Sequence, residues 1–174
     1  MRRRLIALLS SAVLSTSFAS QISAQQTPRP ADPADVSSLD AIIRAYYEVV
    51  SGPAGESADR ARDETLHLPN ALIGVPGANG QLATMTLGDF HDAAGGPRPE
   101  GFFEKEIHRV THRFGNVVQI FSTYESATTP DGEPYTRGIN SIQLTWDGDR
   151  WWIVSWIFDQ ERPGNPIPAE YLPR

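Results

Sequence analysis

The stretch that most constrains this chain is residues 135–161, which contains all four of its tryptophans. Residues 137–146 and 151–158 alternate with a period of two and are rich in β-branched and aromatic side chains, which predicts two long strands. Between them, Gly148 can supply the positive φ that a tight hairpin turn requires. The second strand is apolar on both faces, so both faces must be covered. We expect helices on one side and another sheet or a second subunit on the other.

The first 24 residues have the layout of a secretory signal peptide. Three arginines at positions 2–4 precede an apolar run over residues 5–14, and small residues end the segment at Ala24. The apolar run is too short to cross a bilayer as a helix. We therefore expect a secreted or periplasmic protein cleaved near Ala24, exported by either the general or the twin-arginine route.

Net charge and composition narrow the classes of partner. Removing residues 1–24 takes away three arginines and no acidic residue, so the net charge falls from −6 to −9. An acidic surface disfavours nucleic acid and anionic membranes, and we predict neither as a partner. The absence of cysteine excludes disulfides and thiolate catalysis.

The rest of the chain reads as one α+β domain between a linker and a tail. Residues 25–35 and 162–174 are rich in proline and predict a linker and an extended C-terminal tail, leaving 36–161 as the domain. Capping and apolar spacing predict helices that begin at Ser37, Ser57 and Thr86. Short strands are expected at 71–75 and 82–86. Long strands are expected at 103–114, 117–127, 137–146 and 151–158, with a bulge where the alternation slips near Ile107. Helices on one face of a curved antiparallel sheet follow from this order.

Several of these segments resemble the nuclear transport factor 2-like (NTF2-like) superfamily, which includes ketosteroid isomerases and SnoaL-type cyclases. The resemblance covers residues 36–161. The residues that carry it are Tyr46, Leu68-Pro69-Asn70-Ala71, and the segments 121–125, 138–144 and 147–153. It implies an NTF2-like cone, in which the sheet curls around a ligand-binding pocket closed by the N-terminal helices. It also implies a homodimer formed through the outer sheet face, here Ile139, Ser141, Gln143, Ile153 and Ile157.

The resemblance to ketosteroid isomerases also implies a site. The position of their catalytic base falls on Val75, which cannot accept a proton, while their two oxyanion donors fall on Tyr46 and Asn140. Isomerisation by that mechanism is therefore not expected. With the simplest hairpin register, three more side chains share the pocket face, and the implied ligand site is Tyr46, Val75, Asn140, Trp152, Trp156 and Phe158. The alternatives are a core role for the Tyr46 ring and a buried amide at Asn140 that pairs with backbone or with Tyr46.

The histidines are the remaining candidates for proton transfer near neutral pH. His67 follows the second predicted helix and His91 lies on the third, so either could be a general base. His108 and His112 share one predicted strand face with Glu104 and Glu106. This cluster could bind a metal or form part of a dimer interface, but a solvated edge is the more common arrangement. Since no firm metal-ligand spacing or cofactor motif is present, no metal and no cofactor are predicted.

Three functions are compatible with these observations. The first is an exported protein that binds a small apolar or aromatic molecule in the pocket without catalysis. The second is a cofactor-independent isomerase, lyase or cyclase with a histidine base and with Tyr46 and Asn140 as oxyanion donors. The third is a purely structural association domain. A pocket lined by Tyr46, Asn140 and a histidine would favour the second function, and a filled apolar interior the third.

Expression of the full-length gene should yield a mature protein that begins near Gln25 and is found outside the cytoplasm. N-terminal sequencing of the purified protein checks this, and a mature chain that still begins at Met1 would contradict it.

Overall fold

The computed structural model describes residues 30–77 and 80–174, so the predicted signal peptide lies outside the described residues. The helices are α1 (Pro33–Val36), α2 (Leu39–Val50), α3 (Arg60–Leu66) and α4 (Leu87–Ala94), with a short 3₁₀ helix at Ala169–Tyr171. The strands are β1 (His67–Pro76), β2 (Leu82–Thr86), β3 (Phe103–Phe114), β4 (Val117–Ala127), β5 (Thr136–Trp146) and β6 (Trp151–Gln160).

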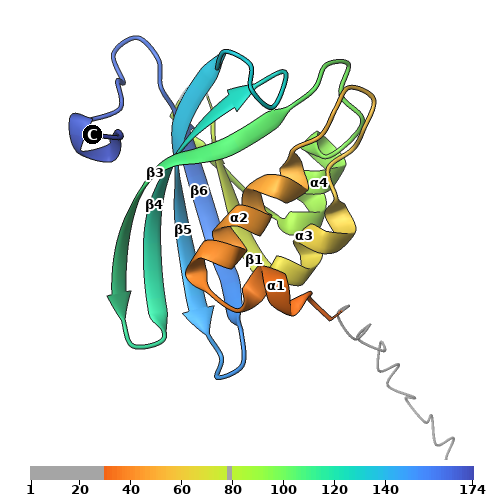
Figure 1. Cartoon of the computed structure of the whole chain (residues 1–174), viewed down its shortest axis with the longest axis vertical. Helices are drawn as coiled ribbons and strands as arrows, with labels where there is room; N and C mark the ends of the chain where they lie inside the picture. Colours follow the sequence, from red (N-terminus) through yellow and green to blue (C-terminus); the bar gives the residue numbers. More distant parts are fainter. Residues whose placement is uncertain (1–29, 78–79) are drawn as a thin grey trace, which may run out of the picture.

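The six strands form one curved sheet with the helices gathered on one face of it (Figure 1). The strand order is β2-β1-β6-β5-β4-β3, and every pair is antiparallel except β1 with β6. The predicted α+β class, with helices on one face of a mostly antiparallel sheet, is confirmed. In the described part of the chain, no helix is long and apolar enough to span a membrane.

Helix α2 fills the concave face of the sheet. Its N-cap is Ser38, whose hydroxyl accepts a hydrogen bond from the Ala41 amide, one residue later than the predicted cap at Ser37. The N-cap of α3 is likewise Asp59 rather than the predicted Ser57, and its side chain accepts a hydrogen bond from the Arg62 amide. The capping box of Thr86 and Asp89 is present as expected. Seven of the twelve α2 residues are buried, because sheet and helices surround α2 on more than one side.

Two β-bulges decide which side chains face the helices. The first shifts the β3–β4 register between Glu106 and His108, so Ile107 is the extra residue, as the slipping alternation predicted. It leaves Glu104 and Glu106 on the concave side but turns His108 and His112 to the outer side, opposite Thr123 and Gln119. The four residues predicted on one face are therefore divided between two.

The second bulge corrects the register predicted for the Trp hairpin. On β6, Ser155 pairs with Gln143 and Ile153 pairs with Leu144, so Val154 is the extra residue. Alternation is reset at that point, which places Ile153 in the core with no exposed surface. Trp152 instead faces outward, where its Nε1 donates to Asp147 Oδ2. Ile153 therefore does not belong to the outer face, nor Trp152 to the inner one.

The segment expected as a linker contributes to the fold at its end. Residues 33–36 form α1, capped by Asp32. The Asp35 carboxylate is buried and accepts two hydrogen bonds from Arg62, from Nε and from Nη2, each at 2.8 Å. The guanidinium holds the pKa of Asp35 below its usual range, against the opposing effect of burial. Residues up to Val36 therefore clamp α1 onto α3.

The C-terminal tail returns along the outer face of the sheet, on the side away from the helices (Figure 1). The Tyr171 ring stacks on Phe121 at 5.6 Å, and Thr123 Oγ1 donates to the Tyr171 carbonyl at 2.7 Å. This contact explains why Thr123 is fully buried although it points away from the helices. The tail thus covers part of the face expected to meet a second copy, and the homodimer stays a prediction.

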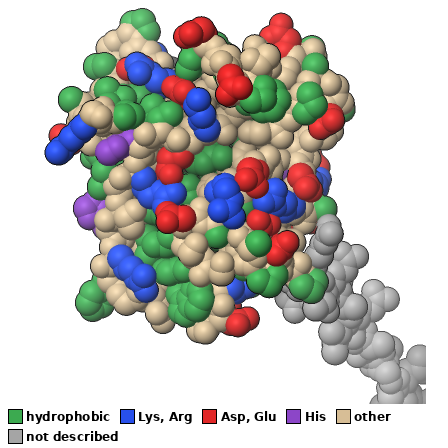
Figure 2. Space-filling model, in the orientation of Figure 1, with side chains coloured by type: hydrophobic (Ala, Val, Ile, Leu, Met, Phe, Trp, Pro, Cys, Tyr) green, Lys and Arg blue, Asp and Glu red, His purple; other side chains and the backbone are tan. Residues whose placement is uncertain are grey.

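Charges of both signs are interspersed on the face that carries α2 and β3 (Figure 2). Arg109 of β3 bridges two elements there, donating to Asp40 of α2 at 2.7 Å and to Glu106 at 2.6 Å. The pair with Glu106 is partly buried on both sides and is less screened than an ordinary surface salt bridge, whereas the Asp40 side chain is 88% exposed. Glu106 also accepts a hydrogen bond from Ser122 Oγ, deeper in the molecule.

Candidate functional site

A cavity of ≈ 190 Å³ lies between the helices and the concave face of the sheet. Seven aromatic residues are in its wall: Tyr46, Phe90, Phe102, Tyr124, Tyr135, Trp156 and Phe158. Trp156 of β6 organises this wall, because Phe90 meets it edge-on at 5.0 Å and Tyr46 at 5.9 Å. Four titratable or charged side chains interrupt the aromatic wall: Asp63, His91, Arg98 and Glu104.

Most of the predicted site residues lie in this wall. Tyr46, His91, Asn140, Trp156 and Phe158 all line the cavity. They are contributed by α2, α4, β5 and β6, which the topology brings around one space.

The other three predicted residues lie elsewhere. Val75 pairs with Ala83 of β2 and is absent from the cavity wall. Trp152 is outside the cavity because of the β6 bulge. His67 is buried behind the wall, where its ring contacts Tyr46 and Trp156.

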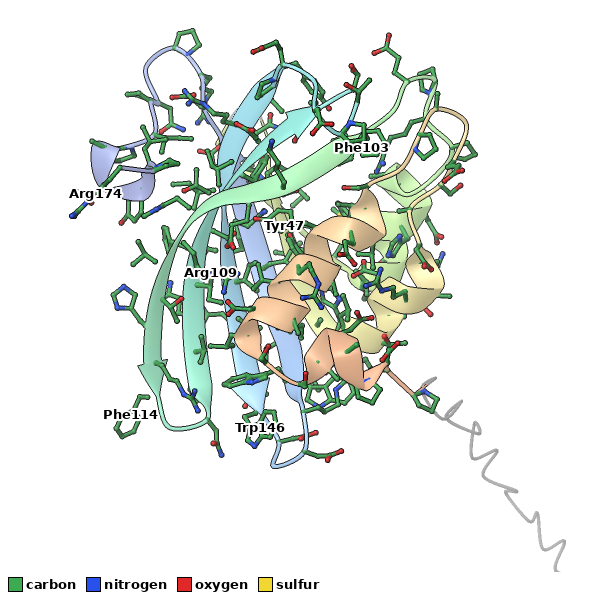
Figure 3. The ribbon with its side chains drawn as sticks, viewed as in Figure 1. Tyr47, Phe103, Arg109, Phe114, Trp146 and Arg174 are labelled. Carbon is green, nitrogen blue, oxygen red and sulfur yellow. The ribbon has the colours of Figure 1, made fainter. Side chains whose placement is uncertain are left out.

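The hydroxyl that meets Asn140 belongs to Tyr47 rather than to its neighbour Tyr46. Asn140 Nδ2 donates to Tyr47 Oη at 3.1 Å, and Tyr47 Oη lies 2.7 Å from Ser122 Oγ. Because the single Ser122 hydroxyl hydrogen goes to Glu106 Oε1, Tyr47 must donate to Ser122. A directed chain of hydrogen bonds thus runs from Asn140 through Tyr47 and Ser122 to Glu106. Figure 3 labels Tyr47 and Arg109, which lie near the two ends of this chain between α2 and the sheet.

The Tyr46 hydroxyl, in contrast, makes no hydrogen bond with any residue that the structure describes. Its ring is held edge-on by Tyr47 at 5.1 Å and by Trp156 at 5.9 Å. Burial raises the pKa of Tyr46 well above its usual value, so the hydroxyl stays protonated and is a hydrogen-bond donor. A buried donor of this kind is available to a hydrogen-bond acceptor placed in the cavity.

In the same wall, the buried carboxylate of Asp63 lies against two histidines. His91 Nε2 lies 2.9 Å from Asp63 Oδ2. His67 Nδ1 lies 3.0 Å from the Asp63 backbone oxygen and 3.2 Å from Oδ1, and its N–H points at the backbone oxygen. Trp156 Nε1 donates to His67 Nε2 at 3.1 Å, and an indole nitrogen can only donate. His67 therefore has its proton on Nδ1 and is neutral.

These contacts keep Asp63 ionised. Burial acts to raise its pKa, but the hydrogen bond from the imidazole of His91 opposes burial and the pKa stays below its usual value. The N–H of His91 is consequently on Nε2, and Nδ1 is the ring nitrogen left to accept a proton. A Cβ on Gly95 would lie 2.7 Å from this Nδ1, so glycine at this position leaves the nitrogen uncovered.

Glu104 of β3 lines the cavity, although from the sequence it was placed only on a strand face with two histidines. Its Oε2 accepts a hydrogen bond from Ser126 Oγ at 2.9 Å, while Oε1 makes none with the described residues. Burial raises the pKa of Glu104 to about 7, although the Ser126 hydroxyl and the field of Arg98 oppose the shift. Near neutral pH this carboxyl group therefore exchanges a proton within the cavity wall.

Arg98 lies in the connection between α4 and β3 and also lines the cavity. Its Nη1 donates to the Val50 carbonyl at 2.7 Å, and its Cζ lies 4.3 Å above the Phe102 ring. No carboxylate of the described chain is within ion-pair distance of it. Nor does the described part contain a group of three or more His, Asp or Glu side chains arranged to hold a metal ion.

Loss of the hydroxyl should affect the free energy of unfolding strongly at Tyr47 and little at the adjacent Tyr46. Tyr47→Phe leaves Asn140 without an acceptor and Ser122 without a donor, so it should lower the free energy of unfolding by about 1–3 kcal/mol. Tyr46→Phe removes a hydroxyl without a protein partner and should change it by less than about 0.5 kcal/mol. Urea unfolding of both variants measures this, and equal losses would contradict the hydrogen-bond chain.

Glu104 should make stability depend on pH. Its pKa is raised by folding from 4.5 to about 7, so its contribution to stability is fully present below about pH 4.5 and is lost as the pH rises through 7. Glu104→Gln should therefore raise the free energy of unfolding by about 2 kcal/mol at pH about 8 and by little at pH about 5. Thermal unfolding at both pH values tests this, and a pH-independent difference would argue against a raised pKa.

Comparisons with known proteins identify the fold. No protein-family model and no curated protein matches the sequence. Among solved structures, an NTF2-like protein of unknown function from Shewanella baltica is 15% identical with a TM-score of 0.51, over 70% of this chain and 89% of that one. A protein from Parabacteroides distasonis, provisionally named a ketosteroid isomerase, is 11% identical with a TM-score of 0.53, over 79% and 98% of the two chains. This chain therefore has the NTF2-like fold that its sequence resembles.

Proposed function

We propose that this protein is exported and binds a small apolar or aromatic molecule in the cavity between α2, α4 and the sheet. The observation that carries the proposal is the aromatic wall around a cavity of ≈ 190 Å³, into which a few polar groups are placed. This combination is typical of small-molecule sites. The volume suits a ligand with a single ring rather than a polycyclic one.

The apolar part of such a ligand supplies most of the binding free energy. Burying about 200 Å² of apolar ligand surface is worth about 5 kcal/mol before the cost of association is subtracted. One hydrogen bond from the Tyr46 hydroxyl would add about 1.4 kcal/mol, or about tenfold in affinity. The polar group therefore contributes selectivity among ligands that the aromatic wall already accepts.

The experiment compares acetophenone with ethylbenzene, which differ by one carbonyl oxygen. Isothermal calorimetry should show binding of both compounds. Tyr46→Phe should lower the affinity for acetophenone by about tenfold and leave the affinity for ethylbenzene almost unchanged. The matched ligand pair separates a lost hydrogen bond from a changed cavity shape. If neither compound, nor a wider panel of single-ring ligands, binds or raises the melting temperature, the proposal fails.

A second candidate function is cofactor-independent isomerisation, elimination or cyclisation with His91 as the base. The observation that favours it is the Asp63–His91 pair, in which the carboxylate orients the imidazole and leaves Nδ1 beside Gly95 at the cavity wall. The Tyr46 hydroxyl would support a developing oxyanion. Asn140, the other expected donor, already gives one N–H to Tyr47. Proton–deuterium exchange at the α-carbon of bound ketones, abolished in His91→Gln, would establish this activity.

A further inference from the structure

We propose that the ligand carries a protonated amine on its single-ring apolar body, and that Glu104 is the counter-ion for that amine. This inference rests on the proposed function, because it specifies the ligand class for the same cavity. It starts from the carboxyl group of Glu104, which lines the cavity with one oxygen engaged and the other available.

The position of Glu104 is fixed by its backbone. Its amide donates to Ser51 Oγ at 3.0 Å, which ties this point of β3 to the C-terminal end of α2. Its Oε2 is held by Ser126 on the neighbouring strand at 2.9 Å. With backbone and one oxygen anchored, Oε1 is the group that a ligand can meet without rearrangement of the protein.

The described protein supplies no cation to pair with Glu104. Arg98 is the cation whose field reaches it, but the Arg98 guanidinium is directed to the Val50 carbonyl and the Phe102 ring. His91 gives its Nε2–H to Asp63, so this donor is already engaged and does not serve Glu104. Tyr46, Tyr47, Tyr124 and Tyr135 are the other titratable groups whose pKa values the charge of Glu104 affects, and none is cationic. An ammonium group of the ligand would provide the missing positive charge.

The aromatic wall fits the same ligand. The faces of aromatic rings attract cations, and an ammonium near several rings gains more than an isolated pair when water is excluded. Tyr46, Tyr124 and Tyr135 approach Glu104 closely enough for its charge to affect their own pKa values. A cation held by Glu104 therefore lies among aromatic side chains, while the apolar body of the ligand packs toward Phe90 and Trp156.

The pH dependence of binding has a defined sign. Burial raises the pKa of Glu104 to about 7, so the carboxyl group is largely protonated below that pH and ionised above it. An alkylammonium group, like that of lysine with a pKa of about 10.4, remains charged on both sides of this value. Affinity for the amine should therefore rise from pH about 5.5 to about 8, whereas affinity for an uncharged analogue should not.

The test titrates the protein with three ligands of matched shape: 2-phenylethylamine, 2-phenylethanol and 3-phenylpropionate. By calorimetry at pH about 8, the amine should bind at least about tenfold more tightly than the alcohol, with this ratio falling several-fold at pH about 5.5. In Glu104→Gln the ratio should fall to about one at both pH values. Glu170→Gln, a matched change at an exposed residue of the tail, should retain the preference.

The outcomes separate this inference from the proposed function. If the alcohol binds as tightly as the amine, or the propionate binds more tightly than both, the amine assignment is wrong although the cavity still binds small molecules. A preference for the amine that persists in Glu104→Gln assigns the counter-ion role to another group and also overturns the inference. If none of the three ligands binds, the amine assignment fails, and the proposed function fails with it only if acetophenone, ethylbenzene and the wider single-ring panel also do not bind. Thermal unfolding of each variant verifies that it is folded.

Discussion

The buried carboxylate of Asp63 joins side chains of four elements into one polar network inside the core. Asp63 belongs to α3, accepts a hydrogen bond from His91 of α4, and lies against His67 at the start of β1. His67 in turn accepts a hydrogen bond from Trp156 of β6. Removing one member of such a network leaves the other buried polar groups unpaired, which costs far more than the net gain from forming it. The back wall of the cavity therefore depends on this one charge.

The same wall shows how two neighbouring tyrosines on one helix acquire different roles. Tyr47 points toward β4 and β5, where Ser122 and Asn140 satisfy its hydroxyl, so it is a structural residue. Tyr46 points toward Trp156 and His67, and its hydroxyl finds no partner in the described chain. Because successive residues of a helix are about 100° apart, a helix in a concave sheet can bury both and present each to a different wall.

The sequence predicted the elements that depend on local patterns. The period-two strands, the Thr86–Asp89 capping box and the bulge at Ile107 each have a local signal, and each is present. The β6 bulge at Val154 had none, because a strand that is apolar on both faces shows no slip when its alternation is reset. Because this bulge was not predicted, Trp152 was wrongly assigned to the pocket face. Glu104 was missed for a similar reason, since a glutamate among charged residues of a strand reads as solvated unless its burial is known.

The pKa values of two carboxyl groups in one wall, Asp63 and Glu104, are shifted in opposite directions. The difference lies in the groups that donate hydrogen bonds to them. Burial acts to raise the pKa of both, but the hydrogen bond from the His91 imidazole opposes this effect at Asp63, whereas Glu104 has one serine hydroxyl and a guanidinium that is directed elsewhere. The carboxylate of Asp63 is thus held by a hydrogen bond from His91, although its Oδ1 accepts none from the described residues. At Glu104 compensation of the charge is incomplete, so the free energy of ionisation depends on what occupies the cavity. A binding site that discriminates by charge requires such a group, and Glu104 offers one at the cavity, because its pKa lies near neutrality and its Oε1 accepts no hydrogen bond from the described residues.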